Sequence, residues 1–144
     1  NQKELDKIRV TLDSITSNPD YEITGIYLTG YASPEGSYAQ NEVLSRDRTR
    51  ALRNYLLRRY SFPENLYHVD WRGEDWIGLK RLILLYGMPN EEQVLSIMEN
   101  YSVFEGREKR LMDLNNGKPY RYMMKHFFPE LRRVDYKITY KVIK

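Results

Sequence analysis

The stretch Gly30–Leu56, with the sequence GYASPEGSYAQNEVLSRDRTRALRNYL, decides the fold of this chain. It predicts the end of a strand, a tight loop and a long amphipathic helix. Leu44, Leu52 and Leu56 recur at helical spacing and would share one apolar face of that helix. Arg48 falls on the same face, one turn from Leu44 and one turn from Leu52. Because an unpaired charge is costly to bury, Arg48 must bind either an acid of the protein or an anionic ligand.

The residues before the helix are of the types that favour a helix N-terminus. Ser33 offers a capping hydroxyl, Pro34 suits the first helical position, and Glu35 suits the positive end of a helix. We therefore expect the helix to begin here and to run to about Tyr60, where Phe62-Pro63 stops it.

The segments around this stretch complete an α/β unit. Residues 1–17 carry apolar side chains at helical spacing, whereas Tyr21–Thr29 and Leu66–Trp71 alternate as strands do. Strand, helix and strand of these lengths form a right-handed βαβ unit when the two strands are parallel. Val134–Val142 alternates apolar with polar residues and predicts a last strand with one face in water.

Residues 75–131 predict an inserted helical subdomain, with helices over about 76–86, 90–101, 104–114 and 119–128. The predicted fold is therefore an α/β (α+β) two-layer sandwich. A mixed sheet of three or four strands would carry the first two long helices on one face, and the insert would precede the last strand. We expect residues 1–144 to form a single domain, and a preceding strand and the rest of a longer parent protein to be missing.

The composition excludes several classes of site. The chain has no cysteine, so it has no disulfide, no thiolate zinc site and no cysteine nucleophile. His68 and His126 are far apart in sequence, and neither lies in a motif with an adjacent acid. We therefore expect a protein that is not an enzyme and binds no metal or cofactor. Nucleic-acid binding is not expected either, because the aromatic-glycine strand motif of RNA-recognition domains is absent and the basic residues are spread out.

Two blocks of the sequence follow a recognisable pattern. Asn41, Leu44, Ser45, Arg48 and Leu52 reproduce the spacing Asn-x-x-Leu-Ser-x-x-Arg-x-x-x-apolar. A strand ending Leu-Thr-Gly and a Gly-Ser turn precede this block, and an Arg-Arg-Val sequence opens the last strand. The chain thereby resembles the OmpA-like C-terminal domain, a periplasmic module that binds peptidoglycan. The sequence Gly-Tyr-Ala-Ser-Pro-Glu-Gly is similar to the Bacteroidetes-type variant of the family. The middle of the chain has no counterpart in the common form of the domain.

The resemblance implies a ligand site centred on Arg48, which would bind the carboxylate of diaminopimelate in the peptidoglycan stem peptide. In the family, an aspartate three residues after the loop glycine pairs with the ligand ammonium, and here that position is Ser33. A serine hydroxyl accepts a hydrogen bond but brings no charge. Glu35 either supplies the missing carboxylate or serves only as an acid at the helix N-terminus.

Other residues would complete this site. Tyr31 and Ala32 would line the wall opposite Arg48. Arg133 would lie near the site and pair with acids, the alternative being a solvated position at a strand edge. The residues expected to support the loop and helix are Asn41, Leu44 and Ser45.

The resemblance implies an anchoring function. The chain would attach an outer-membrane or periplasmic protein of a Gram-negative bacterium to peptidoglycan, in the periplasm, and would meet the membrane only through the rest of its parent. The alternative prediction is that the chain has the same fold but binds a protein partner in place of peptidoglycan. In it, the helical insert, which is rich in Tyr, Phe and Met, docks another envelope protein, and peptidoglycan binding is weak or absent.

Overall fold

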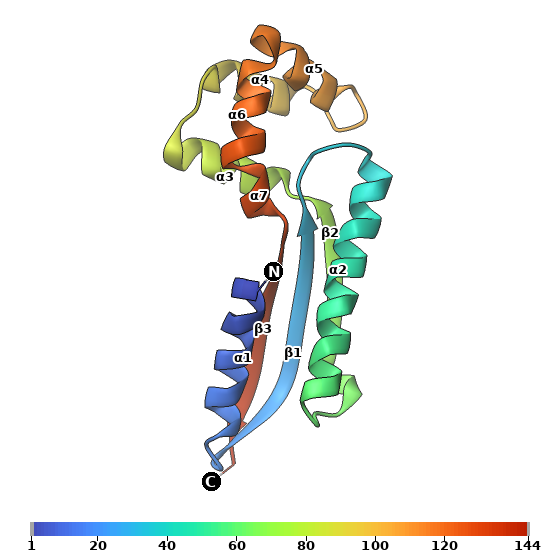
Figure 1. Cartoon of the computed structure of the whole chain (residues 1–144), viewed down its shortest axis with the longest axis vertical. Helices are drawn as coiled ribbons and strands as arrows, with labels where there is room; N and C mark the ends of the chain where they lie inside the picture. Colours follow the sequence, from blue (N-terminus) through green and yellow to red (C-terminus); the bar gives the residue numbers. More distant parts are fainter. Residues whose placement is uncertain (1, 144) are drawn as a thin grey trace.

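Three strands form the mixed sheet that the sequence predicts, in the order β2-β1-β3. The structure is a computed structural model, and it describes residues 2–143. Its body of sheet and long helices carries a helical subdomain at one end (Figure 1). The elements are α1 (Gln2–Thr16), β1 (Tyr21–Ala32), α2 (Tyr38–Arg59), a 3-10 turn (Glu64–Leu66), β2 (Tyr67–Glu74), α3 (Trp76–Tyr86), α4 (Glu91–Asn100), α5 (Arg107–Asp113), a second 3-10 turn (Leu114–Gly117), α6 (Lys118–His126), α7 (Phe128–Leu131) and β3 (Arg133–Val142).

The strand pairing gives the predicted βαβ unit. β1 is central and runs parallel to β2, with Leu28 opposite Val69, and α2 forms the connection between them. On its other edge β1 pairs antiparallel with β3, with Leu28 opposite Tyr136. The predicted fold class is therefore confirmed. The helix predicted over residues 1–17 corresponds to α1, which spans Gln2–Thr16. Residue 1 lies outside the described residues.

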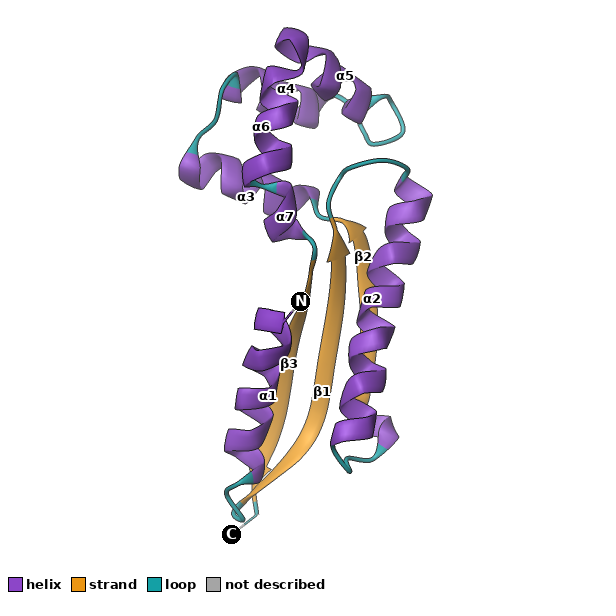
Figure 2. Cartoon of the chain, in the orientation of Figure 1, coloured by secondary structure: helices purple, strands orange, loops and turns teal. Residues whose placement is uncertain are grey.

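Both long helices pack on one face of the sheet (Figure 2). Ile8 and Leu12 of α1 and Leu56 of α2 belong to the same buried cluster as Ile26 and Leu28 of β1. Apolar side chains from three elements thus close one core, and burying each contributes about 1.5–3 kcal/mol.

The opposite face of the sheet is open. There Tyr27 of β1 is exposed and stacks on His68 of β2, with ring centroids 4.5 Å apart. The apolar face predicted for β3 is buried at Val134 but is 50% exposed at Tyr140, so that prediction holds only for the first part of the strand.

The buried face of α2 differs from the predicted one. Asn41, Ser45 and Thr49 point inward, whereas Leu44 is 44% exposed. The reason lies in β1, where Gly30 is so close to α2 that a Cβ atom would clash with Thr49 Oγ1. Only small side chains fit between the two backbones at this crossing. The prediction that Leu44 lies on the buried face is therefore wrong.

The start of α2 also differs from the prediction. Ser37 is the N-cap, and its hydroxyl accepts a hydrogen bond from the Gln40 N–H at 3.3 Å. Ser33 therefore does not cap the helix, and Ser33–Gly36 remains a loop. Gly36 has a φ of 81°, a left-handed conformation that glycine adopts without strain. This turn lies between the predicted cap and the helix.

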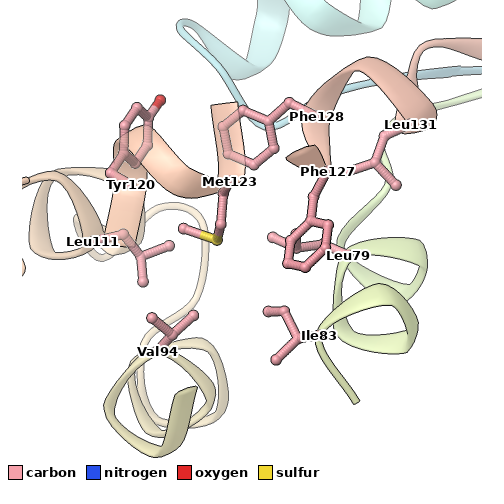
Figure 3. Packing of buried hydrophobic residues seen from close by; sticks show 9 residues of the cluster. All are labelled: Leu79, Ile83, Val94, Leu111, Tyr120, Met123, Phe127, Phe128 and Leu131. Atoms are coloured by element: carbon pink, nitrogen blue, oxygen red, sulfur yellow. The ribbon is translucent and has the colours of Figure 1, made fainter. Parts of the chain in front are cut away.

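The helices of residues 75–131 enclose a second apolar core (Figure 3). The predicted helix over 104–114 is shorter, and the one over 119–128 is divided into α6 and α7 at Phe127. Side chains from five helices meet in this core, so the subdomain buries its own apolar surface. The buried members of the cluster are Leu79, Ile83, Val94, Leu111, Tyr120, Met123, Phe127, Phe128 and Leu131.

Two adjacent residues of α3 test this second core. Ile83 is 0% exposed and Leu84 is 62% exposed. We expect Ile83→Ala to lower the free energy of unfolding by about 2–4 kcal/mol, because it leaves a cavity. Leu84→Ala should change it by less than about 0.5 kcal/mol. Urea denaturation of both variants measures the difference, and equal losses would contradict the described orientation of α3.

Candidate functional site

Arg48 lies beside the buried face of α2, and its side chain is partly exposed. Its Nη1 donates a hydrogen bond to the backbone carbonyl of Tyr31 at 2.8 Å. Within residues 2–143, no carboxylate forms an ion pair with Arg48. The carbonyl fixes the direction of the guanidinium but brings no net charge. The structural ion pair that the sequence left open is therefore not formed among these residues.

A surface hollow between α1 and α2 lies in front of Arg48. Arg48, Leu52 and Tyr55 line it from α2, and Glu4 and Leu5 line it from α1. We call this space the Arg48 hollow. It brings the Arg48 guanidinium and the Glu4 side chain together with apolar surface from Leu5, Leu52 and Tyr55.

Ser33 is occupied by contacts within the protein. It is 5% exposed, and its Oγ accepts a hydrogen bond from Arg132 Nε at 3.1 Å. The Ser33 hydroxyl also lies 3.4 Å from Glu35 Oε1, and Glu35 in turn forms an ion pair with Arg132. Of the two alternatives for Glu35, the one in which it serves only as an acid at the helix N-terminus is therefore wrong, because α2 begins later and Glu35 pairs with Arg132. Sequence reasoning assigned no role to Arg132.

Arg133 points to a different part of the molecule. Its Nη1 donates to Asp75 Oδ2 at 2.7 Å and its Nε to Asp135 Oδ1 at 3.0 Å, and its guanidinium lies 4.2 Å from the centre of the Tyr31 ring. Burial lowers the pKa of Arg133, but the two carboxylates outweigh burial and the pKa is raised. Arg133 pairs with acids as the resemblance implies. However, Arg133 and the Tyr31 ring do not line the Arg48 hollow.

Asn41 and Ser45 form hydrogen bonds near the start of α2, and only those of Asn41 reach the loop. The Asn41 Nδ2 group donates to the Glu35 carbonyl at 2.8 Å and to Glu74 Oε2 at 2.7 Å. Ser45 Oγ accepts from the Gly73 N–H at 3.2 Å. These bonds join the start of α2 both to the loop and to the end of β2. No comparable support comes from Leu44, which is exposed.

The helical subdomain contacts the same loop. Glu108 of α5 accepts a hydrogen bond from the Gly36 N–H at 2.8 Å and another from the Tyr120 hydroxyl at 2.8 Å. Burial and the hydrogen bond to Glu108 both raise the pKa of Tyr120. The rings of Tyr38 and Phe104 meet edge to face beside these bonds. The insert therefore lies against the loop between β1 and α2 (Figure 1) and restrains it.

Glu74 gives this region a measurable pH dependence. Burial raises the pKa of Glu74, and the hydrogen bonds from Asn41 and Trp76 only partly offset that effect. Between the unfolded pKa and the raised folded pKa, the folded state binds more protons than the unfolded state. The contribution of Glu74 to the free energy of unfolding therefore rises as the pH falls through the raised pKa, and is lost as the pH rises.

We expect the free energy of unfolding of the wild type, relative to that of Glu74→Gln, to be larger at about pH 5 than at pH 7. The variant does not titrate at this position, so the comparison cancels the other carboxylates. Chemical denaturation of both proteins at the two pH values gives the difference. A difference that shrinks on acidification would contradict the burial of Glu74.

Comparison with known proteins gives a partial match. No family model matches the chain. Outer membrane protein 41 of Porphyromonas gingivalis is 39% identical over 49 residues, which is 34% of this chain and 12% of the relative. The chain is similar in part to an outer membrane protein of the OmpA type. The matched region is thus a small fraction of the relative's length. Among the described helices, none combines the length and apolar character needed to cross a membrane.

Proposed function

We propose that this chain is a non-catalytic cell-wall-binding module. It attaches an outer-membrane or periplasmic protein to peptidoglycan by binding the carboxylate of the stem-peptide diamino acid. The observation that carries the proposal is Arg48, a partly exposed guanidinium held by the Tyr31 carbonyl and not ion-paired within residues 2–143. The Asn-x-x-Leu-Ser-x-x-Arg pattern and the partial similarity to outer membrane protein 41 support the same assignment.

The geometry suits a carboxylate at the end of an aliphatic chain. A guanidinium has five N–H donors, and one of those on Arg48 is used by Tyr31, so the others remain for a bidentate contact. Leu52 and Tyr55 provide apolar surface for the methylene groups between the two ends of diaminopimelate. A lysine at position 48 would present a point charge and could not reproduce the bidentate contact.

Removing the guanidinium tests the proposal. We expect Arg48→Ala to lower retention on insoluble peptidoglycan from a diaminopimelate-type wall at least tenfold. A charge-assisted hydrogen bond contributes about 1.5–3 kcal/mol, and about 1.4 kcal/mol is a factor of ten. Arg58→Ala is the matched control, because it removes the same charge from an exposed position in the last turn of α2.

Circular dichroism establishes first that both variants fold. Retention lost only in Arg48→Ala supports the proposal. Equal retention of the two variants, or a folded wild type that stays in the supernatant, would refute it.

The exposed apolar surface of the helical insert supports a second candidate function, which is the docking of another envelope protein. Ile77, Leu84, Leu85 and Tyr86 of α3 are each at least 62% exposed, while Leu79 and Ile83 face the core. A helix that is apolar on both sides is usually covered on both sides. A wild type that peptidoglycan does not retain would favour this candidate.

A further inference from the structure

A second hollow lies on the helical insert, and aromatic rings form most of its wall. It has a volume of about 420 Å³, which is within the range of small-molecule sites. Its lining comes from α3, α6 and α7 and from the residue between α6 and α7. We call this space the aromatic hollow, and its lining residues are Leu82, Tyr86, Tyr122, His126, Phe127 and Glu130.

The rings of the aromatic hollow are inclined to one another and do not form one flat stack. The centroid of the Tyr122 ring lies 5.7 Å from that of Phe127, with 75° between the planes, and 4.4 Å from that of His126, with 43° between the planes. Phe127 is 3% exposed and belongs to the core of the insert (Figure 3), so core packing fixes this part of the wall. Tyr86, which is 69% exposed, lines the hollow from α3. Inclined rings from two helices can thus surround a single group.

The charges of the aromatic hollow favour a cation. Its described lining includes one acid, Glu130, and neither a lysine nor an arginine, whereas the Arg48 hollow is lined by a guanidinium. The Glu130 side chain is exposed, and it forms no ion pair within residues 2–143. The face of an aromatic ring is also negative, so the rings and the carboxylate attract positive charge together.

We propose that the aromatic hollow binds an organic cation with a trimethylammonium head group. A primary ammonium has three N–H groups that need acceptors, and a wall made mostly of rings supplies few of them. A trimethylammonium group has no N–H group. Its methyl groups pack against the rings and Leu82, while its positive charge meets the ring faces and Glu130. This site shares no lining residue with the Arg48 hollow, so it extends the proposed function without depending on it.

Choline and 3,3-dimethylbutan-1-ol test whether the site recognises charge, because the two molecules have the same shape and only choline is charged. We expect choline to bind at least tenfold more tightly than the neutral alcohol. We also expect the methyl resonance of bound choline to shift upfield, because the methyl groups lie over aromatic rings. NMR titrations of the wild-type chain measure both effects.

Two pairs of variants test the lining. Tyr86→Leu should weaken choline binding about threefold to tenfold, whereas Tyr86→Phe should retain it because the ring face remains. Both changes replace an exposed side chain, so the fold should be retained. Glu130→Gln should weaken choline binding by a similar factor. Its control is Glu64→Gln, which removes an exposed acid from the 3-10 turn before β2.

Equal affinity for choline and the neutral alcohol would overturn the proposal, as would full choline affinity in both Tyr86→Leu and Glu130→Gln. Either result would leave the role of Arg48 unaffected.

The same head group occurs on free solutes and on lipids, and vesicles distinguish the two sources. Co-sedimentation with phosphatidylcholine vesicles that free choline prevents would identify a lipid. Choline binding by a protein that stays in the supernatant with these vesicles would identify a free solute.

Discussion

The close approach of α2 to β1 at Gly30 is the constraint on which the rest of the site depends. With no Cβ atom at Gly30, Thr49 and Ser45 can lie directly against the strand. This contact fixes the rotation of α2 about its own axis. Arg48 consequently lies at the edge of the packed face, near enough to reach the Tyr31 carbonyl and open enough to meet a ligand.

The loop between β1 and α2 is held from three directions. Asn41 binds its backbone from α2, Arg132 binds Ser33 and Glu35 from the position between α7 and β3, and Glu108 binds Gly36 from the helical subdomain. The insert therefore acts as a brace on one wall of the candidate site, and a binding site built on such restrained elements loses little entropy when it is filled.

Much of the fold could be predicted from periodicity, because the strands and helices carry clear patterns of period 2 and period 3.6. Arg48 could be found because its spacing from Asn41, Leu44 and Ser45 is local. The residues that bind the loop could not be predicted from local spacing, because they are distant in sequence. Glu35 and Arg132 are 97 residues apart, and Gly36 and Glu108 are 72 residues apart. The rotation of α2 does not follow from its apolar pattern, because the close backbone contact at Gly30 favours the small polar side chains of Ser45 and Thr49 on the buried face.

The central claim is that the Arg48 guanidinium is available to an anionic wall fragment. The most direct measurement is the side-chain Nε–H resonance of Arg48 during titration with soluble muropeptides that contain diaminopimelate, with Arg58 as the internal reference. The account predicts that the Arg48 resonance shifts and exchanges more slowly with water while the Arg58 resonance stays unchanged. An unchanged Arg48 resonance, or shifts confined to α3 of the insert, would contradict it.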